Sequence, residues 1–203
     1  VTAVVSAKAL ATAGAGANKV LNSGRRMLTN IGRRQIYKMG MTAVLIFAAQ
    51  AFDFPVGGGT SGHLTGGVLA AVLLGPFAGT IVISVVLAVQ MLFLADGGLF
   101  ALGANIVNMA IIGSLGSYYI YHFLKKVLPQ TPSVMIAAWC SVVLAALSCS
   151  LQIGLSGKAE LAQIAPSMLK THIVVGLAEA FITVAAISAF NLITSKDADR
   201  AID

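Results

Sequence analysis

The chain has 203 residues, of which 58% are hydrophobic and 10% are charged, with 13 Lys and Arg against 7 Asp and Glu. Soluble domains carry about 25% charged residues, so this composition excludes an ordinary soluble domain and indicates an integral membrane protein. The net charge of +6 does not indicate a nucleic-acid partner, because the basic residues gather between the hydrophobic segments, where membrane topology accounts for them.

Three long segments, 64–95, 97–124 and 127–157, contain no Asp, Glu, Lys or Arg. Each exceeds the ~20 apolar residues that a membrane-spanning helix needs. Lipid offers no hydrogen-bond partner to unpaired backbone groups, and the sequence lacks the ten-residue alternation typical of an outer-membrane barrel. We therefore expect an all-α, polytopic integral membrane protein.

Seven hydrophobic segments follow one another along the chain and predict about seven transmembrane helices. The third is the shortest, because residues 64–74 would rise ~16 Å as a helix, about half of the hydrocarbon thickness, before Gly75-Pro76 interrupts the pattern. Either 64–95 is one broken span, or 64–74 is a short helix that turns at the Gly-Pro pair. The seven segments are 1–20, 36–53, 64–74, 76–95, 101–124, 133–153 and 166–195.

The distribution of basic residues orients these segments. With seven segments and the Lys19–Lys38 loop in the cytoplasm, ten basic residues lie inside and two outside, whereas six segments would give eight and four. Because basic residues concentrate on the cytoplasmic side, the count favours seven segments in the cell membrane, with the N-terminus outside and the C-terminus in the cytoplasm. Residues 54–63, 96–103 and 154–165 then lie on the outer side.

The stretch GGGTSGHLTGG, residues 57–67, is rich in glycine and contains one imidazole, that of His63. Neutral imidazole is a common ligand of Ni²⁺, Co²⁺ and Zn²⁺. The chain has three His, so a four-coordinate site needs further donors from the backbone, water, Asn105, Asn108 or residues preceding Val1. A phosphate-binding loop is excluded, because the Lys that follows its last Gly is absent here.

The same stretch allows a second interpretation. Gly59-Thr60-Ser61-Gly62 followed by Gly66 matches the G-x-S-G-x-x-x-G pattern of rhomboid intramembrane proteases, and His172 with Gly176 resembles their second catalytic helix. A rhomboid-like serine protease using Ser61 and His172 is therefore the alternative function. The sequence context argues against it, because that family places three spans before its Ser and has a characteristic Trp-Arg pair in a loop.

Three blocks carry a resemblance to a known family: FPVGGGTSGHLTGGVLAAVLLGP (54–76), DGGLFALGANIVNMAIIG (96–113) and HIVVGLAEAFIT (172–183). In this order and spacing they resemble the membrane substrate-binding component of cobalt and nickel uptake transporters of the energy-coupling factor type. The resemblance implies a near-planar nitrogen site made by the N-terminal amino group, the amide and imidazole of a His at the second position, and a His in the Gly-rich loop. His63 is the counterpart of that last His, and the Met-His is expected upstream of Val1.

The resemblance also implies what the protein does and with what. Residues 1–203 would form a single transmembrane substrate-binding domain that takes up Co²⁺ or Ni²⁺ as transported substrate, without an organic cofactor and without an enzymatic activity of its own. The choice between the two metals stays open. Expected partners are a membrane coupling subunit, two ATPase subunits, a small accessory membrane subunit and the lipid bilayer. A vitamin-binding component of the same transporter type is a third possibility, disfavoured by the single Trp and the short, Gly-built outer loop.

Polar side chains near the Gly-rich loop are candidates for supporting the metal ligand. Asn105 and Asn108 are one helical turn apart, so they are expected either to hydrogen-bond between helices or to orient His63 through its second nitrogen. Ser61 lies two residues before His63 and is a further candidate for this supporting role.

Glu179 is the one acid in an otherwise uncharged part of the last segment, and such carboxylates normally face the interior of a helix bundle. His172 lies on the same face but ~10 Å away along the axis, too far for both to bind one ion. We therefore expect Glu179 to serve structure or conformational coupling. Cys140 and Cys149 are nine residues apart on roughly opposite helix faces and are expected to pack.

Overall fold

The computed structural model describes residues 32–51, 53–56, 60–95 and 97–200. The chain divides into two compact units, Val1–Lys38 and Met39–Asp203. In the first unit the described residues 32–38 are helical, and in the second residues 39–50 are helical. The predicted helix 1–20 and most of the Lys19–Lys38 loop lie outside the described residues, whereas the last seven residues of that predicted loop form helix.

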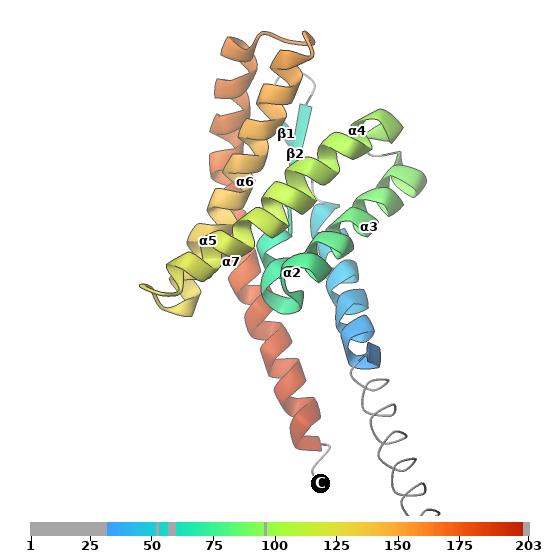
Figure 1. Ribbon diagram of the computed structural model, residues 1–203, viewed down its shortest axis with the longest axis vertical. Helices are drawn as coiled ribbons and strands as arrows, with labels where there is room; N and C mark the ends of the chain where they lie inside the picture. Colours follow the sequence, from blue (N-terminus) through green and yellow to red (C-terminus); the bar gives the residue numbers. More distant parts are fainter. Residues whose placement is uncertain (1–31, 52, 57–59, 96, 201–203) are drawn as a thin grey trace, which may run out of the picture. The chain divides into compact units, whose positions relative to one another are not determined.

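The second unit contains one hairpin and a series of helices (Figure 1). The hairpin consists of β1 (Asp53–Val56) and β2 (Thr60–His63), which pair antiparallel with Asp53 opposite His63. The helices are α2 (Gly67–Leu74), α3 (Pro76–Leu94), α4 (Gly98–Asn105), the π-helix η1 (Ile106–Gly116), α5 (Ser117–Leu124), α6 (Gln130–Leu155) and α7 (Leu161–Arg200).

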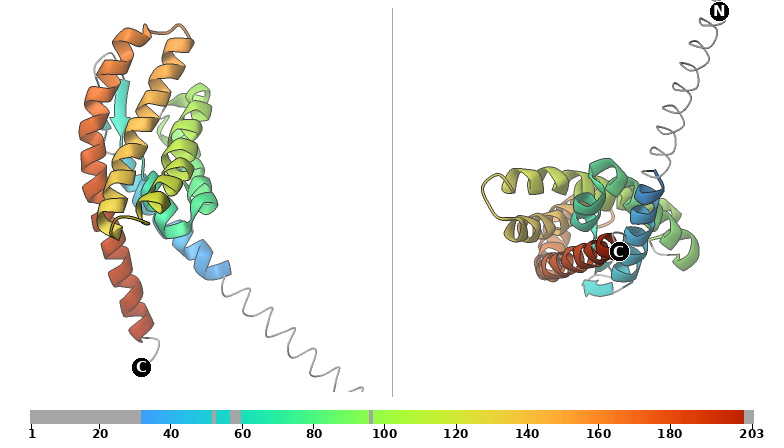
Figure 2. Two further views of the ribbon diagram at one scale, coloured as in Figure 1. Left: turned by 60° about the vertical axis from the view of Figure 1, so that its left-hand side comes forward. Right: turned by 90° about the horizontal axis from the view of Figure 1, so that it is seen from below.

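The connections within this unit gather at two ends. The hairpin, the start of α4 and the α6–α7 turn lie at one end, here called the hairpin end (Figures 1 and 2). The α2–α3 turn and the α5–α6 turn lie at the other, here called the opposite end. This grouping agrees with the expectation that residues 54–63, 96–103 and 154–165 share one side of the membrane.

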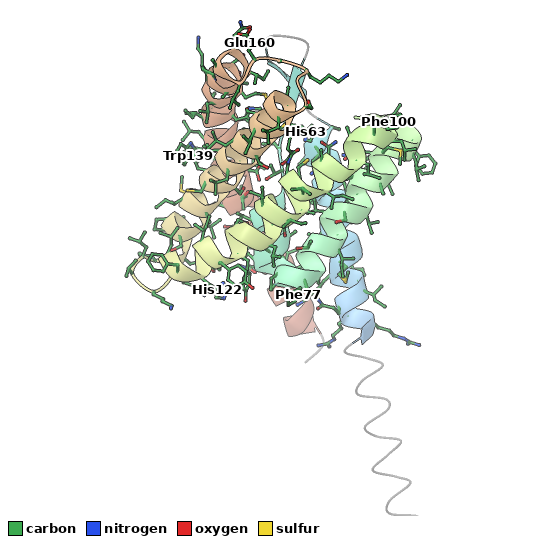
Figure 3. All side chains as sticks on the ribbon, turned by 45° about the horizontal axis from the view of Figure 1, so that its top comes forward. His63, Phe77, Phe100, His122, Trp139 and Glu160 are labelled. Carbon is green, nitrogen blue, oxygen red and sulfur yellow. The ribbon has the colours of Figure 1, made fainter. Side chains whose placement is uncertain are left out.

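Four helical segments of the described chain are long and apolar enough to cross a membrane: Pro76–Leu94, Gly98–Leu124, Gln130–Leu155 and Leu161–Leu192. Their outer faces carry exposed apolar side chains, including Phe77 and Phe100, which point away from the helices in Figure 3. In a soluble protein such faces would be unfavourable, so this is a polytopic helical membrane protein.

Six of the seven predicted segments overlap helices among the described residues, four of which are long and apolar enough to span a membrane. For residues 64–74 the short-helix alternative is the one observed. Helix α2 has eight residues and ends at Gly75, whose φ of 85° is open to glycine at low cost. Pro76 then occupies the first turn of α3, where its missing N–H has no helical partner to lose.

The fold is helical, as expected, with two departures from the predicted segments. Residues expected to form a loop before His63 pair as the β1–β2 hairpin, because a short connection satisfies its backbone N–H and C=O groups by pairing with itself. The predicted helix 101–124 contains the π-helix η1. Helix α2 approaches η1 very closely, since a Cβ added to Gly67 would lie 2.1 Å from the carbonyl oxygen of Gly113.

Helices α6 and α7 run side by side over the length of α6 (Figures 1 and 2). Gly176 lets α7 approach Trp139 of α6 so closely that an added Cβ would lie 3.0 Å from Trp139 Cδ1. The Trp139 Nε1–H donates to the carbonyl of Ile173 at 3.2 Å. Trp139 and Gly176 therefore lie at a close contact between α6 and α7.

Candidate metal-binding site

His63 ends strand β2, so the hairpin sets where its imidazole enters the helical unit. The side chain is half-buried, and Figure 3 shows it between α6 and the segment that begins with α4. Its Nδ1 lies 3.4 Å from the carbonyl oxygen of Leu64, which is long for a hydrogen bond. This contact therefore does little to orient the ring.

Glu179 of α7 fixes the backbone that follows His63. Its carboxylate accepts from the N–H of Thr65 at 2.6 Å, from the Thr65 hydroxyl at 2.5 Å and from the N–H of Gly66 at 3.0 Å. The Thr65 carbonyl in turn accepts from Gln50 Nε2 at 2.9 Å. These bonds hold the residues directly after His63 from two sides, and Glu179 is 1% exposed. The geometry agrees with the structural role expected for Glu179.

A cavity of about 90 Å³ lies beside His63 and draws its walls from five elements. Besides apolar residues, it is lined by two imidazoles, two amides, a hydroxyl, a thiol and two thioethers. The lining residues are His63, Thr65, Asn105, Asn108, Met109, Val142, Ala145, Ala146, Cys149, Met168 and His172. The structure thus gathers His63, His172, Asn105 and Asn108, all singled out in the sequence, around one space.

Asn108 has its hydrogen bonds satisfied by Gln152 of α6. Asn108 Nδ2 donates to Gln152 Oε1 at 3.1 Å, and Gln152 Nε2 donates to Asn108 Oδ1 at 2.9 Å. Two roles were expected for Asn108, and this reciprocal amide pair corresponds to the first, a hydrogen bond between helices. Asn105 packs instead against the turn before α4, since its Nδ2 would lie 2.7 Å from a Cβ on Gly97.

The cavity by itself does not complete a metal site. Within the described ranges, no group of three or more His, Cys, Asp or Glu is arranged to hold a metal ion. The side chain of Ser61 lies outside the described residues. The third imidazole, His122, is exposed on α5 and lies toward the opposite end, where its Nδ1 is 3.2 Å from the Tyr118 carbonyl oxygen (Figure 3).

Comparison with known proteins identifies the family. Residues 1–196 match the model of the family CbiM, described as the cobalt uptake substrate-specific transmembrane region. The chain belongs to the CbiM family. This confirms the resemblance to cobalt and nickel uptake components, and it decides against the rhomboid-like alternative.

Individual relatives are named for metal transport. The chain is 42% identical over 151 residues to a NikMN protein of Archaeoglobus fulgidus named for nickel transport, covering 73% of this chain and 51% of the relative. It is 34% identical over 165 residues to the cobalt transport protein CbiM of Moorella thermoacetica, covering 77% and 62%. The chain therefore spans about half to two thirds of the length of these relatives.

A solved structure supports the fold. A crystal structure described as a truncated transition metal transporter superposes with a TM-score of 0.73 at 30% identity, covering 80% of this chain and 82% of that one. A second, described as a transition metal transporter, gives a TM-score of 0.74 with 79% and 78% covered. The helical arrangement of this CbiM family member is thus shared with solved metal transporters.

Sequence reasoning missed several residues of this site. Cys149 packs against Ile164 and Met168, as expected, and its place in the lining of the cavity was not foreseen. Gln152 and Thr65 were not singled out, although they hold Asn108 and Glu179. The available signal for Gln152 was its polarity within a long uncharged run, the same signal that identified Glu179.

Proposed function

We propose that this chain is the substrate-specific membrane component of a transporter that captures Co²⁺ or Ni²⁺ as cargo at the hairpin end. The observation that carries the proposal is the placement of His63, with a second imidazole, in one cavity of a CbiM family member. Borderline divalent ions such as Ni²⁺ and Co²⁺ favour imidazole nitrogen, whereas Mg²⁺ favours oxygen ligands.

His63 is proposed as the metal ligand within these 203 residues. The remaining donors are those that the family resemblance assigns to an N-terminal Met-His. Asn105, Asn108 and Ser61 are proposed as supporting residues, and the Glu179 bonds to Thr65 and Gly66 keep His63 in place. In this arrangement the protein binds the ion and holds it, and it performs no covalent chemistry.

Uptake is proposed to require partners. The sequence contains no nucleotide-binding motif, so ATP hydrolysis would belong to two separate ATPase subunits joined through a membrane coupling subunit, with a small accessory membrane subunit. The distribution of basic residues supports a multi-pass orientation with the N-terminus outside and the C-terminus in the cytoplasm. The hairpin end would then face outward and receive the ion.

His63→Ala in the protein with its natural N-terminus tests this function. Loss of a residue that only hydrogen-bonds to a metal ligand lowers metal affinity by up to ~100-fold. His63→Ala removes a direct donor, so we expect the affinity for Co²⁺ and Ni²⁺ to fall by more than this. Isothermal titration calorimetry measures the affinity, and the melting temperature checks that the variant is folded. Ser61→Ala should weaken binding mildly.

His122→Ala is the matched control, since His122 is exposed and lies outside the cavity. It should bind both metals as the parent protein does. Unchanged affinity in a folded His63→Ala variant would overturn the ligand assignment. Loss of a peptide-cleaving activity in Ser61→Ala would instead restore the protease alternative.

A further inference from the structure

Glu179 is the one acidic side chain that is buried among the described residues. The groups that donate to its carboxylate are all neutral: the N–H and hydroxyl of Thr65 and the N–H of Gly66. Gly66 is also the N-cap of α2, and the start of a helix favours a negative charge nearby. The carboxylate is thus stabilised by backbone and hydroxyl donors instead of by an opposite charge.

Few titratable groups lie on the elements that pack against α7, and α2 and residues 39–50 have none. They are the thiols of Cys140 and Cys149 on α6, Asp53 of β1, His63 of β2 and, about two turns before Glu179 on α7 itself, His172. Within the described residues, the hydrogen bonds of Glu179 go to Thr65 and Gly66 instead. A change in the charge of Glu179 therefore acts first on these two residues.

A proton on Glu179 would change the balance of donors and acceptors at this point. The ionised carboxylate only accepts, and it offers about four lone-pair positions to its three donors. A protonated carboxyl brings a fourth donor, its own O–H, and keeps less capacity to accept. Thr65 and Gly66 are both buried, so a hydrogen bond that they lose is not readily replaced by water. The ionised form therefore holds the segment after His63 more firmly than the neutral form does.

We propose that Glu179 is a proton-sensitive latch, whose ionised form holds Thr65 and Gly66 and whose protonation frees this segment and weakens the hold on Co²⁺ or Ni²⁺. The inference rests on the proposed metal-capture function and adds a control to it. Glu179 does not line the cavity beside His63, so it acts through the backbone and adds no metal ligand. Because linkage is reciprocal, metal binding and protonation of Glu179 oppose each other equally.

The ratio of Ni²⁺ affinities between the parent protein and Glu179→Gln, measured by calorimetry over a range of pH, tests the latch. Both affinities fall with pH, because the ligand nitrogens also take up protons, and the ratio removes this shared effect. We expect the parent protein to bind ~10–100-fold more tightly at mildly alkaline pH, and the ratio to approach one as the pH is lowered. A ratio that stays constant over the whole range would overturn the proposal.

Glu160→Gln is the matched control, because Glu160 is an exposed carboxylate at the start of α7 that accepts from Gln163. The ratio between the parent protein and this variant should stay near one at every pH. All variants are made in the full chain with its natural N-terminus.

Infrared difference spectroscopy follows the proton itself in the metal-free parent protein. The carbonyl stretch of a buried protonated carboxyl should grow as the pH is lowered, be absent in Glu179→Gln, and shrink when Ni²⁺ is added at fixed pH. Thr65→Val serves as a second variant where Glu179→Gln does not fold. It removes one donor to the carboxylate, so the band should appear at higher pH. The absence of a band, or a band that Thr65→Val does not move, contradicts the latch.

These outcomes separate the latch from the proposed function. If His63→Ala abolishes Ni²⁺ binding while the ratio between the parent protein and Glu179→Gln is constant, the latch fails and metal capture stands. If the parent protein binds neither Co²⁺ nor Ni²⁺, the proposed function fails, and control of metal release by Glu179 fails with it. A ratio that approaches one, together with a Ni²⁺-sensitive band, supports the latch.

Discussion

Replacing Glu179 by Gln tests how the Gly-rich segment is held. Two carboxylate oxygens accept three hydrogen bonds, from both the N–H and the hydroxyl of Thr65 and from the N–H of Gly66. An amide of the same shape has one acceptor oxygen and one NH₂ group. In the best orientation its oxygen still serves Gly66 and the hydroxyl, while its NH₂ faces the N–H of Thr65.

The N–H of Thr65 and the new NH₂ group are then buried without an acceptor, which costs at least about 1–3 kcal/mol. In a chain of this length each kcal/mol lowers the melting temperature by ~2–4 °C, so Glu179→Gln should lower it by ~2–12 °C. The same bonds position His63, so the affinity for Ni²⁺ should also fall. Loss of residues that orient a metal ligand typically costs ~10–100-fold in metal affinity.

Thermal unfolding in detergent and calorimetry with Ni²⁺ measure the two effects. Glu160→Gln is the matched control, because Glu160 is exposed at the α6–α7 turn, where its carboxylate accepts from Gln163. Thr65→Val removes one of the three donors and should give a smaller loss than Glu179→Gln. If Glu179→Gln melts and binds like Glu160→Gln, the carboxylate does not hold the segment and the reasoning is refuted.

Two further predictions concern packing around the site. Gly67→Ala should lower the melting temperature by ~6–12 °C, since overpacking against the Gly113 carbonyl costs ~3 kcal/mol or more. Gly103→Ala is the control and should change the melting temperature little, because nothing lies within 4 Å of the added Cβ. A similar melting temperature for both variants would contradict the close approach. The Asn108–Gln152 pair should show ~1–3 kcal/mol of coupling in a double-mutant cycle with Ala, and additive single effects would count against it.

The helices could be predicted because apolar length and charge-free runs report directly on membrane spans. The ends were less accurate: the last helix begins at Leu161, before Pro166, and α6 extends beyond the predicted 133–153 at both ends. Hydropathy marks the part of a helix inside lipid, while the helix itself continues into polar residues. The hairpin and η1 could not be predicted, because backbone pairing and a wider helical turn leave no mark in residue type.

The site was predictable where a residue type is chemically rare in a membrane segment. Glu179 was found for that reason, whereas His63 was found as the one imidazole of the Gly-rich loop and His172 through the protease alternative; the two histidines share a cavity. The hydrogen bonds around the site were not predictable, because the partners lie far apart in sequence. Glu179 is 114 residues from Thr65, and Gln152 is 44 residues from Asn108. Such pairs are decided by how helices pack.

The structure also explains how a glycine-rich segment can hold a side chain in place. Glycine offers no side chain for packing, so the segment after His63 must take its order from outside. Glu179 supplies it from α7, and Gln50 supplies it from the helical residues before the hairpin. Because His172 lies two turns before Glu179 on the same helix, α7 carries one imidazole into the cavity and, through Thr65, fixes the backbone of the other. The relative position of the two imidazoles is therefore set by one rigid helix and three hydrogen bonds.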